Sequence, residues 1–161
     1  MDGKSENPAH LLDDSDRRLL ALIQQDATLT AQALGERLNL SSSQAARRRQ
    51  RLEAQGFVRA TRAVVDPQRV GLNVQAFIQV VMATHTEDNA RDFAALTRRQ
   101  PEIVGAWTLT GEADYMLRVY CTDLEALNRL VQHVLLPHPA VSRVQSQIVM
   151  DRIKPDAPLP L

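Results

Sequence analysis

The chain has 161 residues, of which 44% are hydrophobic but only 4% aromatic, so aliphatic side chains must build most of its core. Its 19 basic and 19 acidic residues cancel, so any attraction to nucleic acid must come from local rather than net charge. The single cysteine, Cys121, excludes an intramolecular disulfide, and no apolar run reaches the ~18 residues of a membrane span or forms a signal peptide. These features favour a protein of the reducing cytoplasm.

The N-terminal third predicts a set of short helices. Residues 1–12 are polar and are expected to form a flexible leader. Asp13 then suits an N-cap, two more acids follow in the first turn, and leucines at helical spacing extend a first helix to about Gln25. Thr30 is expected to cap a second helix, which ends at a turn near Asn39.

The third predicted helix is rich in arginine. Ser41 and Gln44 have the spacing of a capping box at its start, and Gly56 suits the positive φ at its end. Four arginines lie within five positions of this helix: Arg47, Arg48, Arg49 and Arg51. Two helices joined by a short turn, the second of them arginine-rich, predict a helix-turn-helix. The alternative is a charged helix face that is merely solvated.

Basic residues gather around this third helix. From Arg37 to Arg62 there are seven arginines and one acid, Glu53, whereas the chain from Ala63 onward has nine basic residues and eleven acids. Because phosphate groups respond to the local field, the basic segment predicts contact with double-stranded DNA.

The expected DNA contacts follow from position on this helix. Residues near its leading end are expected to reach base edges, and the flanking arginines are expected to hold phosphates. The predicted DNA-binding residues are Ser41, Ser42, Ser43, Gln44, Arg47, Arg48 and Arg51. Arg49 shares a face with Ala45 and Leu52, toward the first two helices, so it has either a structural or a DNA-contacting role.

After Gly56 the pattern changes from helical to extended. Residues 57–65 are strand-like and predict a wing. The helix-turn-helix domain is therefore expected over residues 13–62, with a linker over 63–73.

The remaining chain predicts strands and helices in the order β-α-β-β-α-β. The expected strands are 74–82, 103–109, 115–120 and 141–153, and the expected helices are 87–100 and a segment from Asp123 to about Pro137. This order is that of the ferredoxin-like split βαβ fold, here over residues 74–154, with a loose proline-rich tail over 155–161. The predicted class is α+β: an N-terminal winged helix-turn-helix plus a C-terminal ferredoxin-like domain.

One face of the predicted sheet lacks a cover. The two helices of such a domain lie on the same sheet face. We therefore expect the other face, formed by the apolar strands 74–82 and 103–109, to be buried against a second copy of the chain, giving a homodimer.

Two motifs resemble a known family. Leu-Ser at the helix-turn-helix turn, with Arg-Leu-Glu-Ala-Gln-Gly-Phe-Val over 51–58, and the loop Gly-Glu-Ala-Asp-Tyr over 111–115 are similar to the leucine-responsive and asparagine regulator (Lrp/AsnC) family. The resemblance covers about residues 11–154. It implies a sequence-specific DNA-binding transcriptional regulator that forms dimers or larger assemblies, up to octamers, and that responds to a small molecule, an amino acid.

The resemblance also implies where the effector binds. The candidates are Thr110, Gly111, Glu112, Ala113, Asp114, Tyr115, Ser146 and Gln147. Glu112 stands where the family usually has aspartate, and Arg49 where it usually has an apolar residue, which leaves the effector and the tilt of the third helix open. An amino acid needs acceptors for its ammonium group and donors for its carboxylate, which Glu112, Asp114 and backbone amides can offer. The alternative is that Gly111 and Asp114 only build an exposed hairpin turn.

The sequence contains no motif for catalysis, metal binding or a cofactor. It has no glycine-rich phosphate loop, nucleophile elbow or paired-acid site, and its four histidines are scattered, so we expect no enzyme activity, metal or cofactor. Trp107 is expected to be a packed strand residue and Cys121 a buried small hydrophobe. Two other functions stay open: a metabolite-binding regulatory module of an enzyme, and an architectural DNA-compacting protein.

Overall fold

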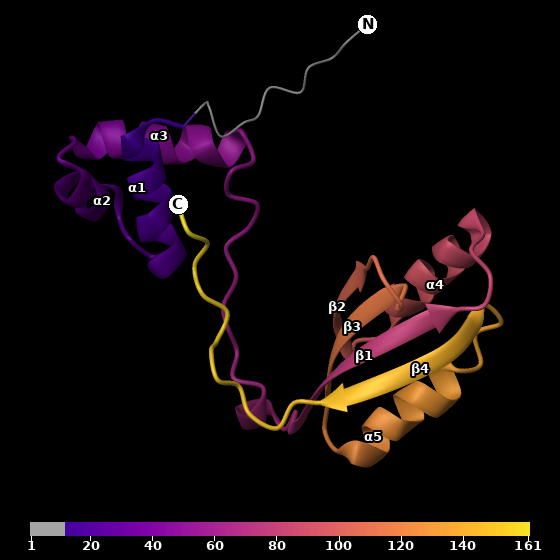
Figure 1. The fold of residues 1–161 in the computed structure, drawn as a ribbon. Helices are drawn as coiled ribbons and strands as arrows, with labels where there is room; N and C mark the ends of the chain where they lie inside the picture. Colours follow the sequence, from indigo (N-terminus) through magenta and orange to yellow (C-terminus); the bar gives the residue numbers. More distant parts are fainter. Residues whose placement is uncertain (1–11) are drawn as a thin grey trace, which may run out of the picture. The chain divides into compact units, whose positions relative to one another are not determined.

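The computed structural model describes residues 12–161, so nearly all of the predicted leader lies outside the described residues. The chain forms two compact units (Figure 1). Of the described residues, one unit contains 12–63 together with Lys154–Leu161, and the other contains Val64–Ile153. Among residues 12–161, no helix is long and apolar enough to cross a bilayer.

The first unit contains the three predicted helices. They are α1 (Asp14–Gln25), α2 (Ala31–Leu38) and α3 (Ser42–Ala54). The predicted caps are confirmed: Asp13, Thr30 and Ser41 each accept a hydrogen bond from the backbone three residues later. The core between the helices is aliphatic, and its fully buried members are Leu19, Leu34, Ala45 and Leu52.

The chain reverses tightly between α2 and α3, and the reversal leaves no room for a side chain at Gly35. Asn39 has φ 57°, in the left-handed region that asparagine tolerates better than most residues. A Cβ on Gly35 would lie 2.7 Å from the carbonyl oxygen of Leu40, a contact that real Cβ atoms do not make. The absence of a side chain at Gly35 therefore lets the chain reverse closely enough for α3 to pack on α2.

The prediction of a strand over residues 57–65 was wrong, because this segment has no strand structure. Phe57 donates to the carbonyl of Leu52 and closes the end of α3, where Gly56 has the expected positive φ of 79°. Beyond Val58 the side chains are exposed, and no described strand pairs with the segment. A strand is stabilised by its ladder, so extended propensity without a partner leaves the backbone irregular.

The second unit is a four-stranded antiparallel sheet with helices on one face. Its elements are β1 (Val74–Met82), α4 (Glu87–Arg99), β2 (Ile103–Thr108), β3 (Tyr115–Cys121), α5 (Leu124–Arg129) and β4 (Val141–Ile148). The strand order is β2-β3-β1-β4, which confirms the predicted βαββαβ fold. Alternate residues of β1 and β3 are buried under the helices, around Phe93 of α4 and Leu127 of α5.

The last helix and the last strand both differ from the prediction. The helix after Asp123 is α-helical only to Arg129 and continues as a π-helical turn, Leu130–Leu135. The strand predicted to reach Ile153 ends at Ile148. β4 pairs only with β1, which begins at Val74, so after Val149 donates to the carbonyl of Gln75 there is no further partner strand.

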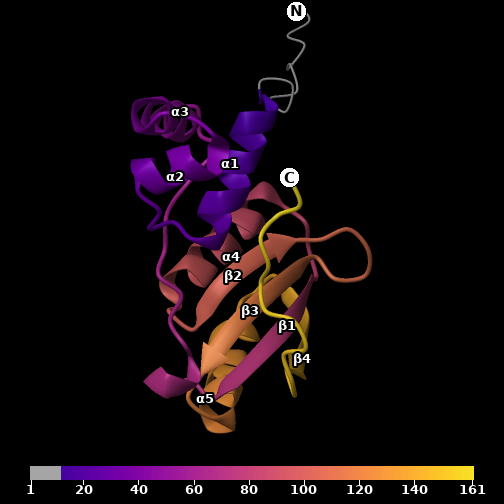
Figure 2. The same ribbon diagram turned by 90° about the vertical axis from the view of Figure 1, so that its left-hand side faces the viewer.

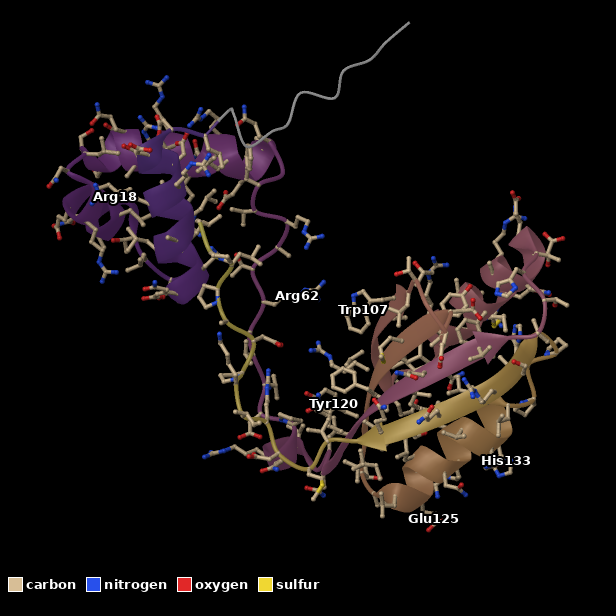
Figure 3. The ribbon with its side chains drawn as sticks, in the orientation of Figure 1. Arg18, Arg62, Trp107, Tyr120, Glu125 and His133 are labelled. Atoms are coloured by element: carbon tan, nitrogen blue, oxygen red, sulfur yellow. The ribbon has the colours of Figure 1, made fainter. Side chains whose placement is uncertain are left out.

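The sheet face away from the helices is less apolar than predicted. Strand register places Phe77, Val81, Trp107, Met116 and Tyr120 on it. The same face also carries Gln75, Gln79, Arg118, Arg143, Gln145 and Gln147. Figure 3 shows Trp107 and Tyr120 on the side opposite α5, and Trp107 is 47% exposed although it covers Gly105.

Candidate functional site

The exposed face of α3 begins at its N-terminus. Ser42, Ser43, Gln44 and Arg47 are all exposed. Arg47 makes no ion pair with any described residue, so its guanidinium is available to a partner. The leading turn of this helix therefore presents hydroxyls, an amide and one full guanidinium outward.

Ser41 and Gln44 hold the end of the helix in place. The Ser41 hydroxyl accepts from the backbone N–H of Gln44 at 3.2 Å, and the Gln44 side-chain oxygen accepts from the backbone N–H of Ser41 at 2.9 Å. This capping box, predicted from the sequence, uses only the oxygen of the Gln44 amide. The NH₂ group of Gln44 keeps its donors for another acceptor.

Arg48 and Arg51 have partners within the chain. The carboxylate of Asp16, which is 1% exposed, receives Arg48 Nη1 at 2.8 Å and Arg51 Nη2 at 2.6 Å. Arg48 Nη1 also lies 2.6 Å from Asp13. The two arginines predicted to hold phosphates thus join α3 to the start of α1.

These charges shift one another's pKa values. The hydrogen bond from Arg48 lowers the pKa of Asp13, with help from the backbone N–H of Asp16. In return the two carboxylates raise the already high pKa of Arg48. Both shifts favour the charged forms of Asp13 and Arg48, which strengthens the hydrogen bond between them.

Arg49, whose role the sequence left open, is structural. Its Nε lies 2.9 Å from Glu53, and its terminal nitrogens donate to the carbonyls of Leu29 and Ala27 at 3.1 and 3.3 Å. The guanidinium therefore satisfies carbonyls of the loop between α1 and α2, where an aliphatic residue could not.

Three further arginines of the basic segment remain exposed around α3. They are Arg37 at the end of α2 and Arg59 and Arg62 in the segment after α3. The sequence placed them in the basic segment but gave them no role. Their charges are not cancelled by an ion pair among residues 12–161.

We expect Asp16→Asn to destabilise the first unit by about 2–3 kcal/mol. This is below the roughly 3–5 kcal/mol of a fully buried pair because both arginines keep contact with water. Urea unfolding followed by circular dichroism measures the effect. Asp14→Asn is the matched control, since Asp14 is exposed and lies in the same turn; an equal loss in both variants would contradict the pairing.

The second candidate region is the loop joining β2 to β3, which stands out from the end of the sheet in Figure 2. Thr110, Gly111 and Glu112 form its exposed tip, and Gly111 has φ 112°. Ala113 is buried, and Tyr115 turns inward to stack on Phe93 with ring centres 4.7 Å apart. Only the tip of the motif is therefore open to a ligand.

Asp114 does not lie in an exposed turn, which the sequence left open as an alternative to effector binding. Its side chain is 27% exposed, one carboxylate oxygen accepts from the backbone N–H of Met82 at 2.7 Å, and the other lies 2.7 Å from Nε2 of His85. The backbone N–H of Asp114 donates to the carbonyl of Val80. Asp114 thus fastens the loop to the end of β1.

Ser146 and Gln147 lie away from the loop within one chain. They pair with Ile78 and Phe77 on β1, and β1 separates β4 from β3, which carries the loop. Two strand spacings amount to about 10 Å, and successive strand residues point to opposite faces. The structure brings Asp114, His85 and the loop tip together but leaves these two residues apart from them.

Sequence reasoning missed two residues of these sites. Asp16 was interpreted only as a helix-start acid, although an acid at helical spacing among buried leucines signals a paired charge. His85 was one of four scattered histidines, and its pairing with Asp114 depends on the register of β1 and β3. The predicted burial of Cys121 and the predicted caps at Asp13, Thr30 and Ser41 are confirmed. Burial raises the pKa of the Cys121 thiol.

The pKa of Asp114 should lie below the ordinary aspartate value of roughly 4. The N–H of Met82 is the larger cause and His85 the smaller. The stabilisation is therefore complete above the unfolded-state pKa and is lost as the pH falls through the lower folded-state value. His85→Ala should raise the pKa of Asp114 only part of the way, as measured by NMR of its carboxyl carbon.

The internal control for this titration is Asp123. Its pKa is also lowered, by the backbone N–H of Ala126 and the hydroxyl of Thr122, and His85 takes no part. A shift of Asp123 as large as that of Asp114 in the variant would contradict the assignment.

Comparison with known proteins covers both units. Residues 12–59 match the family model of a winged helix-turn-helix DNA-binding domain, and residues 75–159 match the Lrp/AsnC ligand binding domain. The chain is 35% identical to the DNA-binding transcriptional activator DecR of Escherichia coli K12, over 94% of this chain and 99% of that protein. It is 31% identical to the glutamate uptake regulatory protein of Zymomonas mobilis, covering 93% and 91% of the two chains.

A solved structure agrees with the whole fold. The transcriptional regulator NMB0573 of Neisseria meningitidis, crystallised in complex with L-Met, superposes with a TM-score of 0.88 and 40% sequence identity. The match covers 92% of this chain and 96% of that chain. Both units and their order along the chain are therefore shared with these regulators.

Proposed function

This chain belongs to the Lrp/AsnC family of DNA-binding transcriptional regulators with a ligand-binding domain, and we propose that it reads DNA through the leading turn of α3 under the control of an amino acid. The observation that carries the proposal is the exposed face of α3, where Arg47 is available while Arg48, Arg49 and Arg51 are held within the chain. Because its target is chromosomal DNA, the proposed location is the cytoplasm.

The proposed contacts divide into two sets. Ser42, Ser43, Gln44 and Arg47 face base edges, since the N-terminal residues of a recognition helix enter the major groove. Arg37, Arg59 and Arg62 supply positive charge for the phosphates on either side. Ser41 holds the helix end, and Arg48 and Arg51 hold the angle of α3 while their remaining N–H groups stay open to a phosphate.

We expect Arg47→Ala to weaken binding to a selected operator by roughly 1–3 kcal/mol and to relax preference at one base position. Arg59→Ala should instead weaken binding to all sequences alike and reduce the salt slope by about one unit. Fluorescence anisotropy on operator and scrambled DNA at several salt concentrations measures both effects. Arg129→Ala removes an equal charge from α5 and is the control; equal effects of all three variants would refute the assignment.

The proposed effector site is the tip of the β2–β3 loop. Glu112 supplies an acceptor for an ammonium group, and the backbone N–H groups around Gly111 supply donors for a carboxylate. Asp114 acts by holding this loop to β1, since both of its oxygens already have partners. Ser146 and Gln147 join the site if a neighbouring chain brings its β4 to the loop. A ligand regulates only if it binds one assembly or DNA-binding state more tightly than another.

Thermal-shift screening with the twenty amino acids should identify the effector, because a ligand of the native state stabilises it by about 2.7 kcal/mol at one hundred times its Kd. Glu112→Ala should abolish the ligand-dependent shift and leave the unliganded unfolding temperature unchanged, since Glu112 is exposed. Glu125→Ala on α5 is the control. An unchanged ligand response in Glu112→Ala would exclude the loop tip as the site.

We propose that the protein is a homodimer, capable of larger assemblies, joined through the open sheet face. Aromatic and aliphatic side chains on this face gain from burial, and its glutamines can hydrogen-bond across an interface. Tyr120→Asp should shift the full chain toward monomer in light scattering, whereas Leu124→Asp, on exposed α5, should not. A wild-type monomer at micromolar concentration would contradict the proposal.

A DNA-binding experiment distinguishes this function from the two others that the sequence left open. An enzyme's regulatory module would not retard genomic fragments in a gel shift, and an architectural protein would retard all of them without response to an amino acid. The capped helix with an outward Arg47 favours sequence-specific recognition over both.

A further inference from the structure

The C-terminal segment returns to the DNA-binding unit. Lys154–Leu161 packs with the helix-turn-helix unit although it follows the sheet domain in sequence. The side chain of Gln24 on α1 makes two hydrogen bonds to the backbone of Leu159: its Oε1 accepts from the N–H at 2.7 Å, and its Nε2 donates to the carbonyl at 3.4 Å. One amide thus pairs with both backbone groups of a single residue, as a neighbouring strand would.

Leucines of this segment line a groove of mixed polarity on the DNA-binding unit. Leu159 and Leu161 are among the residues that line a groove of about 770 Å³. Its apolar lining also includes Leu20 and Ile23 of α1, and Phe57 and Val58 of the segment after α3. The residues that failed to form a wing strand are therefore the ones that face the C-terminal segment.

We propose that Leu159-Pro160-Leu161 is an intramolecular latch whose docking site is this groove on the chain's own DNA-binding unit. Docking gives that unit a second connection to the sheet domain, through residues 154–158, in addition to the linker over 63–73. The proline fixes φ in the docked segment and lowers the entropy lost when it is held.

The contact is shallow, which fits a tethered occupant rather than a free peptide. Leu159 is 71% exposed and Leu161 is 52% exposed, so little apolar area is buried. Such a segment binds weakly in trans. A short tether gives it a local concentration in the roughly millimolar range, which is enough to occupy a weak site.

The backbone mobility of Leu159, measured as an NMR order parameter, tests the latch, because the N–H of Leu159 donates to Oε1 of Gln24. In uniformly ¹⁵N-labelled full chain, we expect an order parameter above about 0.6 at Leu159, where flexible backbone falls below that value. Gln24→Ala, or Leu159→Gln combined with Leu161→Gln, should lower it below 0.6. Gln24 is exposed and alanine favours helix, so the variant keeps its fold.

The matched control is Gln25→Ala, one position along the same helix and outside the groove, which should leave the order parameter unchanged. The proposal is overturned if the Leu159 amide is flexible in the wild type. It is also overturned if this amide stays ordered both in Gln24→Ala and in the double variant with Leu159→Gln and Leu161→Gln. Mixing labelled Gln24→Ala chains with excess unlabelled wild type separates docking within a chain from docking between chains. Leu159 should stay flexible in that mixture, and recovered order would show that the occupant comes from another copy.

Discussion

A carboxylate removed from water is costly unless charged partners accompany it, and the partners of Asp16 come from another helix. The side chain of Asp16 is held at the base of α1 by its own capping box, so Arg48 and Arg51 must approach it in one arrangement. This constraint, with the close turn at Gly35, determines how α3 lies on the other two helices. The outward direction of Ser42, Ser43 and Arg47 follows from the partners on the inner side.

In the sheet domain the corresponding constraint is the alternation of strand residues. It places one set of β1 and β3 side chains under α4 and α5 and the other set on an open face of mixed polarity. The same alternation separates Ser146 from Gln147. The end of β1 is also where Asp114 binds Met82, so the loop that carries Glu112 is attached to the most central pair of strands.

Much of this organisation follows from the sequence because it depends on local chemistry. Caps at Asp13, Thr30 and Ser41, the stop at Gly56 and the order of strands and helices require only neighbouring residues and periodicity. What could not be predicted depends on partners distant in the chain. The segment 57–65 has strand propensity but no partner strand, and β4 ends where its antiparallel partner β1 begins. Arg48 and Arg51 look free in the sequence until Asp16 is placed beside them. Propensity and charge are properties of residues, whereas pairing is a property of the fold.

The two faces of α3 also bear on how regulators of this kind diverge after gene duplication. A substitution at Ser42, Ser43 or Arg47 changes the chemistry presented outward without disturbing a buried pair. A substitution at Arg48 or Arg51 instead leaves Asp16 short of a partner and calls for a second, compensating change. Single mutations can therefore change the chemistry of the exposed face of α3, while both copies keep the packing of the helix on Asp16.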